Sequence, residues 1–184
     1  MSTTGRLLVA TPPLDDPNFE RSVILMLNHD ADGAFGLVLT RPTEVESVGA
    51  EAVLDDWITH TSIPSVFFEG GPVQQNSIIG LARIDGDSGP EWASAVGNGY
   101  YTVDLNSDAS NGAACAALRL FVGYSGWGPT QLDEEIAMEN WFVLDAQPSD
   151  AFDNEPETLW RRVLERDPTH RNWVRKFPDD PNLN

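Results

Sequence analysis

The stretch with the most conspicuous chemistry is residues 123–136, which read GYSGWGPTQLDEEI. Ser125 follows Gly123 at the spacing of the G-x-S-x-G nucleophile elbow, in which a strained turn exposes a serine for acyl transfer. That motif needs a second glycine at position 127, where this chain has Trp127, whose side chain would crowd the turn. The pattern therefore predicts a structural Ser125, and we predict no catalytic residue.

The glycines and the threonine that follow predict a turn between a strand and a helix. Gly126 or Gly128 is expected to adopt a positive φ, which glycine tolerates because it has no Cβ. Thr130 is expected to be the N-cap of the helix, with Asp133 three residues later as its capping-box partner.

That helix would carry four acidic side chains within seven positions, a set that suits acid–base chemistry or a divalent metal. They are Asp133, Glu134, Glu135 and Glu139. Such metal centres usually add histidine, but the three histidines of the chain form no H-x-x-x-H or E-x-x-H pair. We therefore expect no metal and no cofactor. A hydrolase or nuclease that uses carboxylates of residues 133–139, with a divalent metal, stays open as the alternative function.

A second polar group surrounds Phe19 and the hairpin that follows it. It contains Asp15, Arg21 and His29, and Arg41 lies at the far end of the hairpin. A basic residue within an apolar strand must reach solvent or pair with an acid, because an unpaired buried charge is costly. Two interpretations stay open: a structural network of Arg and Asp, or a pocket for a small ligand or a partner.

Two further features are interpreted as structural. Gly70, Gly71 and Pro72 lack the spacing and the lysine of a phosphate-binding loop, and they predict a corner of the backbone. Cys115 lies in an alanine-rich segment with Arg119 as its one basic neighbour in sequence. It is therefore predicted to be a small buried side chain and not a nucleophile.

The elements that would position these residues are mainly strands. Apolar runs bounded by turn residues predict strands at 7–10, 22–27, 35–39, 65–68, 78–84, 100–105, 118–124 and 141–144. Helical spacing predicts helices at 45–58, 110–117, 130–138 and 157–166. Because strands and helices do not alternate strictly, the class is α+β, with one domain over residues 1–166. The proline-containing segment 167–184 is predicted to be a poorly ordered tail.

The composition narrows the class of protein. The chain has 184 residues, and 29 acidic residues against 11 Lys and Arg residues give a net charge of −18, which argues against a general polyanion binder. The single cysteine excludes an internal disulfide and indicates a reducing compartment. No apolar run approaches the length of a membrane helix, and the N-terminus lacks the pattern of a secretion signal. We expect a soluble, cytoplasmic protein that does not bind membranes.

One segment departs from this acidic character. Residues 160–176 contain six of the eleven bases and two acids, with Trp160 and Trp173 among them. The segment is either a nucleic-acid-contacting face or is attracted to the acidic body of the protein. No helix-turn-helix or other reading motif accompanies it, so we expect no sequence-specific nucleic-acid binding.

Four ordered motifs resemble the AlgH/YqgE family of bacterial proteins. They are GRLLVATPPLDDPNFERSVILML (5–27), HDADGAFGLVLTRP (29–42), FEGGPV (68–73), and GYSGWGPTQLDEEI (123–136) followed by Trp141. The resemblance implies an α+β fold with a strongly bent, partly split, mainly antiparallel sheet that forms a pseudo-barrel, flanked by about four short helices. It also implies a cytoplasmic protein that is sometimes labelled a transcriptional regulator and has no established active site.

The resemblance gives the set of candidate binding residues. Those that match recurring family motifs are Asp15, Phe19, Arg21, His29, Arg41, Gly70, Gly71, Pro72, Trp127, Gln131 and Glu135. At position 130 the family commonly has glycine, where this chain has threonine. The leading hypothesis is a non-catalytic binding or regulatory protein whose surface includes these residues and that acts through an unknown protein partner or a small ligand.

Overall fold

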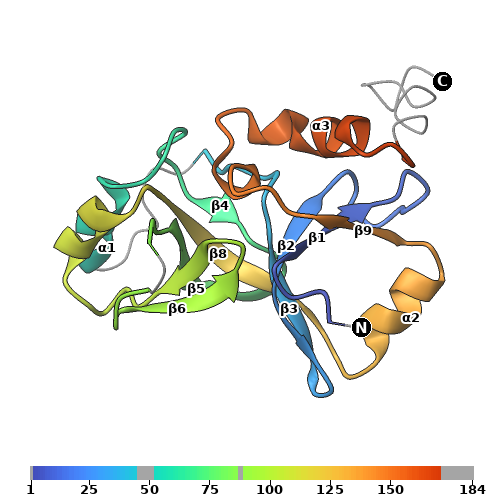
Figure 1. Cartoon of the computed structure of the whole chain (residues 1–184), viewed down its shortest axis with the longest axis horizontal. Helices are drawn as coiled ribbons and strands as arrows, with labels where there is room; N and C mark the ends of the chain where they lie inside the picture. The colour runs from blue at the N-terminus through green and yellow to red at the C-terminus, as the bar shows by residue number, and fades with distance from the viewer. Residues whose placement is uncertain (1, 45–51, 87–88, 171–184) are drawn as a thin grey trace.

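The computed structural model describes residues 2–44, 52–86 and 89–170, in which nine strands form one curled sheet (Figure 1). The strand order is β6-β7-β5-β8-β3-β2-β1-β9, and β4 pairs with β8 off this path. The pairs are antiparallel except for the parallel pair of β4 and β8. The strands are β1 (Arg6–Ala10), β2 (Val23–Asp30), β3 (Gly33–Val38), β4 (Phe68–Glu69), β5 (Val73–Arg83), β6 (Ala93–Gly97), β7 (Tyr100–Val103), β8 (Ala117–Trp127) and β9 (Trp141–Asp145).

Strand β8 joins the two halves of this sheet. It pairs with β5 from Ala117 to Tyr124, with a register shift between the pairs Val122–Ile78 and Tyr124–Val73, and its last residues, from Ser125, pair with β3. Gly123 lies at this register shift with a φ of 66°, and a Cβ there would lie 2.6 Å from the carbonyl oxygen of Gly71. Only glycine fits this close approach of two backbones. The change of partner explains why the sheet is bent and partly split, as predicted.

Short helices cover the sheet. The α-helices are α1 (Ala52–Ile58), α2 (Gln131–Ala137) and α3 (Leu159–Arg166), and the 3₁₀ helices are η1 (Ala109–Ala114), η2 (Asp150–Phe152) and η3 (Pro156–Thr158). Leu7 and Val9 of β1 share a core with the buried side of α3, whereas Leu8 and Ala10 share one with Leu132 of α2. Alternate side chains of a strand point to opposite faces, so α2 and α3 cover opposite faces of β1. The α+β class is confirmed.

Most strands that the sequence predicted are present, but the one expected at 65–68 is reduced to the two-residue β4, which shares only Phe68 with it. The sequence missed β6, whose five residues, ASAVG, are mostly exposed at one edge of the sheet. Strand β5 begins at Val73 and not at residue 78. The loop of the first hairpin contains only Ala31 and Asp32, because β2 and β3 extend into the segment between the predicted strands 22–27 and 35–39. Backbone pairing across the sheet extended these strands beyond their apolar runs.

The predicted helices differ mainly in the connecting segments. The alanine-rich helix expected at 110–117 is the 3₁₀ helix η1, and its cap is Asp108, whose side chain accepts from the N–H of Ser110. Of the helix expected at 45–58, residues 45–51 lie outside the described residues. Of the tail predicted at 167–184, residues 171–184 also lie outside them. Its first residues are placed by contacts, since His170 bonds with Asp167 and its ring lies against Phe142.

Candidate functional site

An aromatic cluster joins the N-terminal loop, the end of β8 and the start of β9. The ring of Phe19 stacks on Trp127 at 6.1 Å and meets Trp141 edge-on at 5.5 Å. Both indole N–H groups donate to Oε2 of Glu135, at 2.9 Å from Trp127 and 2.8 Å from Trp141. The structure therefore brings together three predicted candidates, Phe19, Trp127 and Glu135, and adds Trp141. We call this set the indole cluster.

Gln131 extends the indole cluster along the first turn of α2. Its Nε2 donates to Oε1 of Glu135 at 3.0 Å, and its Oε1 accepts from the backbone N–H of Gly128 at 3.1 Å. The same side chain thus fixes the turn before α2 and the carboxylate that holds the two indoles. These contacts are all made within the protein, so they give this part of the candidate set a structural role.

The turn before α2 differs from the prediction. Gly126 lies in β8 and pairs with Phe35 of β3. Neither Gly126 nor Gly128 has a positive φ. Thr130 is the N-cap residue of α2, as predicted, but it has a left-handed φ of 65° and its side chain makes no capping bond to the backbone. Its hydroxyl donates instead to Glu134 at 3.3 Å. The prediction of a left-handed glycine failed because β8 continues through Trp127, so the residue with a positive φ is Thr130.

His29 ties the N-terminal residues to α2. Its Nδ1 lies 3.0 Å from Oγ1 of Thr3, and its Nε2 lies 3.6 Å from Oδ2 of Asp133. Both Thr3 and the imidazole are buried. Three of the four acids that the sequence offered for a metal site therefore contact other side chains of the protein. They are Asp133, Glu134 and Glu135. Among the described residues, no group of three or more His, Cys, Asp and Glu side chains is arranged to hold a metal ion.

The polar group around the N-terminal loop is only partly assembled. Arg41 reaches this loop but donates to the carbonyl oxygen of Pro17 at 2.9 Å, not to a carboxylate. Arg21 lies over the ring of Trp160, 5.8 Å from its centroid, and Asp15 is exposed. The candidate arginines therefore lie on two separate contacts rather than in one pocket.

The corner at residues 70–72 is packed against β8. The buried hydroxyl of Ser125 donates to the carbonyl oxygen of Gly70 at 3.2 Å, and the same oxygen accepts from the N–H of Val38 at 3.0 Å. At Gly71 a Cβ would lie 2.4 Å from the backbone nitrogen of Ser125. Pro72 is exposed beside them. Gly70 and Gly71 are thus required by close backbone packing, and Ser125 holds that packing together.

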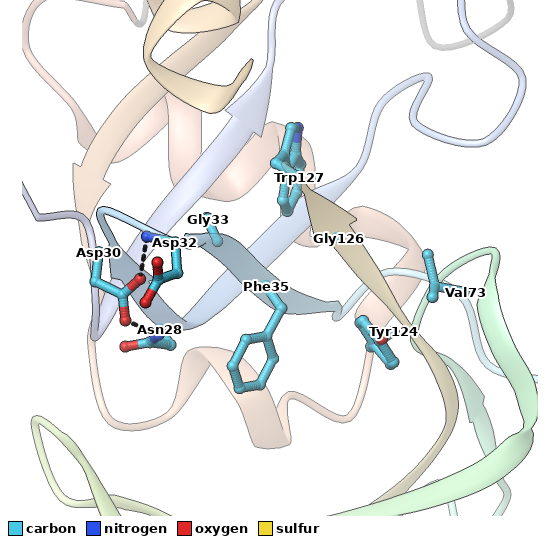
Figure 2. A pocket seen from close by; sticks show the side chains of 10 residues that line it. Asn28, Asp30, Asp32, Gly33, Phe35, Val73, Tyr124, Gly126 and Trp127 are labelled. Carbon is cyan, nitrogen blue, oxygen red and sulfur yellow. Dashed lines mark hydrogen bonds between the residues drawn. The ribbon is translucent and has the colours of Figure 1, made fainter. Parts of the chain in front are cut away.

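A groove of about 400 Å³ opens at the tip of the β2–β3 hairpin, where it meets the end of β8 (Figure 2). We call it the tip groove. The residues that line it come mainly from four strands, β2, β3, β5 and β8. They include Val73 of β5 and Trp127 of β8. The residues that give it its chemistry are Asn28, Asp30, Asp32, Phe35, Tyr124 and Gly126. Of the predicted candidates, only Trp127 lines it.

One end of the tip groove is anionic. Asp30 accepts from Nδ2 of Asn28 at 2.7 Å and from the N–H of Asp32 at 2.9 Å. These hydrogen bonds, the side-chain bond first, hold the pKa of Asp30 below its ordinary value. Both carboxylates are exposed at the hairpin turn. The other end is aromatic, because Phe35 and Tyr124 meet edge-on with their ring centroids 6.0 Å apart.

The sequence contained a signal for the acids of the tip groove but not for the groove itself. The run 28–33, NHDADG, was visible as a polar loop. Phe35 and Tyr124 are 89 positions apart and meet only because β3 pairs with β8, which sets Phe35 opposite Gly126. Gly126 has no side chain to fill the space beside the two rings. The register of the sheet therefore creates the groove.

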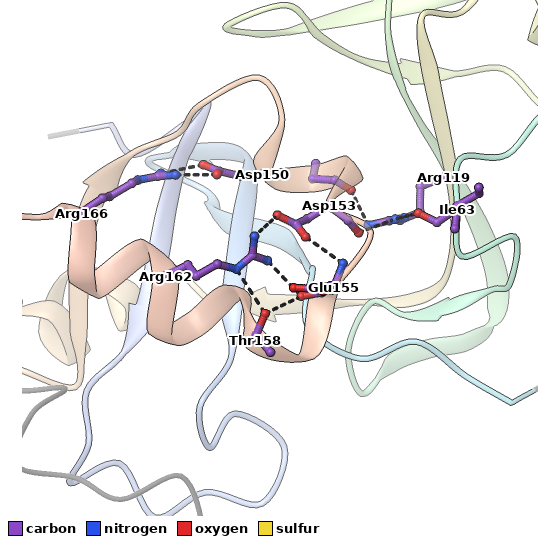
Figure 3. Close-up of polar contacts among 9 residues, drawn as sticks. Ile63, Arg119, Asp150, Asp153, Glu155, Thr158, Arg162 and Arg166 are labelled. Atoms are coloured by element: carbon purple, nitrogen blue, oxygen red, sulfur yellow. Dashed lines mark hydrogen bonds and ion pairs between the residues drawn. The ribbon is translucent and has the colours of Figure 1, made fainter.

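In the described part of the basic segment, residues 160–170, the arginines contact acids of the protein itself (Figure 3). Arg162 donates to Asp153 at 2.6 Å, and Arg166 donates to both carboxylate oxygens of Asp150, at 2.6 and 2.7 Å. Trp160, which would have stacked on bases, is buried and donates to the carbonyl oxygen of Ala10. Arg161 lies 3.9 Å from Oε1 of Glu165, and the remaining three bases of the segment, at 171, 175 and 176, lie outside the described residues.

Arg119, which in the sequence stands out only as the basic neighbour of Cys115, is a buried side chain that anchors three backbone carbonyl groups. Its guanidinium donates to the carbonyl oxygens of Ile63, Ala151 and Asp153 at 3.1, 2.8 and 3.0 Å (Figure 3), and it lies 4.1 Å from the centroid of Phe68. Burial lowers the pKa of Arg119 to about 10. An apolar strand pattern gives no signal for such a residue.

Cys115 is half-buried, in agreement with its predicted structural role. Its Sγ lies 3.8 Å from the carbonyl oxygen of Asn111, and burial raises the pKa of the thiol to about 11. A thiol with a raised pKa is mostly protonated near neutral pH and is a poor nucleophile.

Comparison with known proteins agrees with this geometry. The sequence profile of the AlgH-like family matches residues 7–170. The chain belongs to the AlgH-like family. It is similar to UPF0301 proteins from Streptomyces coelicolor, with 46% identity over 100% of this chain and 96% of the relative, and from Thermobifida fusca, with 42% identity over the same shares.

Two solved structures extend the likeness to the AlgH-like fold. A crystal structure of a protein from Corynebacterium diphtheriae superposes with a TM-score of 0.82 at 30% identity, covering 90% of this chain and 87% of that one. The solution structure of the AlgH protein from Pseudomonas aeruginosa superposes with a TM-score of 0.68 at 24% identity, covering 90% and 89%. The family resemblance and the fold it implied are therefore confirmed. In the described ranges, no helix of this AlgH-like protein combines the length and apolarity needed to cross a membrane.

Proposed function

We propose that this AlgH-like protein is a non-catalytic binding protein of the bacterial cytoplasm that holds a ligand in the tip groove. The observation that carries the proposal is the groove itself, a hollow of about 400 Å³ with carboxylates at one end and aromatic rings at the other. Ligand sites typically combine a concave apolar surface with a few polar groups that fix orientation. In this proposal, the protein exerts a regulatory role by binding the ligand or by binding a protein partner that carries the ligand.

The chemistry of the lining favours binding over catalysis. A general acid or base works best with a pKa near the operating pH, whereas hydrogen bonds lower the pKa of Asp30. Asp30 is therefore a permanent anion near neutral pH. Such a group supplies charge and hydrogen-bond acceptors but does not exchange protons during a reaction.

The alternative of a hydrolase or nuclease loses its physical basis in the contacts of α2. Glu135 accepts two indole hydrogen bonds. Asp133 contacts His29, and Glu134 accepts a hydrogen bond from Thr130. A carboxylate held by two indoles would have to abandon them to bind a metal or a substrate. Nucleic-acid binding is likewise not part of the proposal, since Trp160 is buried and Arg162 and Arg166 pair with acids.

The proposal is tested by a fragment screen followed by amide chemical-shift mapping on ¹⁵N-labelled protein. We expect hits whose shifts are centred on residues 28–35 and 124–127. Gly126→Ala should weaken these hits at least tenfold, because a Cβ there would lie 3.2 Å from the ring of Tyr124 and would narrow the groove. Gly128→Ala is the matched control, since its Cβ would meet only Gln131, at 3.9 Å. A screen without hits in the groove, or hits unaffected by Gly126→Ala, would contradict the proposal.

A further inference from the structure

We propose that the ligand of the tip groove is an organic cation, a guanidinium or ammonium group attached to an apolar body. This inference rests on the proposed function and names the chemical class that the same site would take. It follows from the distribution of charge, rings and empty space in the groove.

The charge at the hairpin turn is not compensated within the groove. Asp30 and Asp32 lie on the turn, and none of the residues that line the groove is basic. Asp30 already accepts two hydrogen bonds, whereas the carboxylate of Asp32 accepts none from the described part of the chain. Two neighbouring carboxylates at the rim of a concave surface attract a cation and repel an anion.

The aromatic end provides the second half of the recognition. Phe35 is 37% exposed, an unusual position for a phenylalanine, and it meets Tyr124 edge-on. Aromatic faces attract guanidinium and ammonium groups through the ring quadrupole and also pack against apolar groups. Gly126, opposite Phe35 in the sheet, leaves the space that the body of the ligand would occupy.

The polar side chain of Asn28, which lines the tip groove, is already oriented. Nδ2 of Asn28 donates to Asp30, so its amide is fixed with the carbonyl oxygen as the acceptor that remains. That oxygen accepts no hydrogen bond from the described residues. A planar guanidinium presents several N–H donors in a rigid fork, which suits carboxylates and an amide oxygen that line the same groove. Guanidinium is accordingly the head group that this groove fits best.

The test compares argininamide with citrullinamide, its neutral isostere, by calorimetry and amide shift mapping at 50 mM salt. We expect argininamide to bind at least tenfold more tightly, with shifts at residues 28–35 and 124–127. Asp32→Asn should weaken it at least fivefold, and binding should weaken with salt because the charges are exposed. Glu91→Gln, which removes an exposed acid outside the groove, should change the affinity less than twofold.

The outcomes separate this inference from the proposed function. Equal affinity for the two amides, or no loss in Asp32→Asn, would overturn the cation while leaving a groove that binds neutral fragments. If neither amide nor any fragment binds in the groove, both proposals fail. A blocked peptide, Gly-Gly-Arg-Gly-Gly, distinguishes the source of the cation. Tighter binding than argininamide would identify a peptide side chain, and weaker binding would identify a free small molecule.

Discussion

The indole N–H groups of Trp127 and Trp141, which end β8 and begin β9, both donate to one oxygen atom, Oε2 of Glu135. This shared acceptor connects the two strands through α2. Hydrogen bonds to a charged group contribute about 1.5–3 kcal/mol each. A buried donor that loses its acceptor adds a desolvation penalty to this loss. Glu135 therefore links the end of β8 and the start of β9 to α2.

Removal of this acceptor should destabilise the protein strongly. We expect Glu135→Ala to lower the free energy of unfolding by about 2–4 kcal/mol, because both buried indoles lose their acceptor. Glu134→Ala, which removes an exposed neighbour, should change it by about 0.5 kcal/mol or less. Urea titrations monitored by tryptophan fluorescence measure both. Equal effects of the two substitutions would show that the shared acceptor has no energetic weight.

Thr130→Gly should stabilise the protein. Thr130 has a φ of 65°, in the left-handed region that is unfavourable for a β-branched residue, and its side chain is exposed. Glycine adopts this conformation without steric cost, so we expect a gain of up to about 1 kcal/mol despite its larger unfolded-state entropy. Thr130→Ala keeps a Cβ and should gain less. Thermal melts of the three proteins are sufficient, and a lower melting temperature for Thr130→Gly is the result we do not expect.

Gly71→Ala should be one of the most damaging substitutions in the chain. Gly71 has a φ of 150°, and its Cβ would lie 2.4 Å from the backbone of Tyr124 and Ser125. Neither backbone can move without disturbing the pairing of β8, so we expect a loss of about 3 kcal/mol or more. Gly128→Ala serves again as the control. Soluble yield and urea midpoints report the effect, and a fully stable Gly71→Ala would refute this description of the corner.

Arg119→Lys should destabilise the fold even though it conserves charge. A lysine cannot present donors to the carbonyl oxygens of Ile63, Ala151 and Asp153 together. We expect a loss of about 2–4 kcal/mol, since buried acceptors lose their donors and a buried charge loses partners. Arg83→Lys, at an exposed pair with Asp85, should have almost no effect. The difference between the two urea midpoints is the measurement.

The pair of Arg162 and Asp153 should give stability that depends on pH. Burial acts to raise the pKa of Asp153, but the hydrogen bonds from Arg162 and from the N–H of Glu155 outweigh it, and the pKa lies below 3.8. A lowered folded-state pKa means that the stabilisation is present above the unfolded pKa of 3.8 and is lost as the pH falls through the folded pKa. The side chain of Arg162 is 42% exposed, so screening keeps the contribution small.

Arg162→Gln is the corresponding experiment. At pH 7 we expect it to lower the free energy of unfolding by about 0.5–1 kcal/mol. The difference from the unmodified protein should shrink by at least half once Asp153 is protonated, leaving the part due to the hydrogen bond with the carbonyl oxygen of Glu155. Urea titrations at several pH values from 7 down to about 2 follow this change, because the folded-state pKa of Asp153 lies below 3.8. A difference that stays constant across that range would assign the contact to the backbone bond alone.

Local sequence determined the class and the central strands of this protein. Residues 22–27 and 35–39 are apolar runs of strand length, and in the structure they form the paired centre of the sheet, with Leu25 and Leu37 fully buried. The ordered motifs were sufficient to identify the family, because they combine strand ends, glycine corners and the start of α2. Apolar periodicity and turn residues act over a few positions, so they can be recognised without a partner strand.

Only the tertiary structure decided which residues form a site. The sequence assigned the chain reversal to Gly126 or Gly128, but pairing with β3 keeps β8 extended and moves the left-handed residue to Thr130. The same pairing sets Phe35 opposite Gly126 and opens the tip groove. The register between strands 89 positions apart is fixed by the packing of the whole sheet, and no local pattern encodes it. Sequence therefore identified the elements, and strand register placed acids, rings and empty space beside one another.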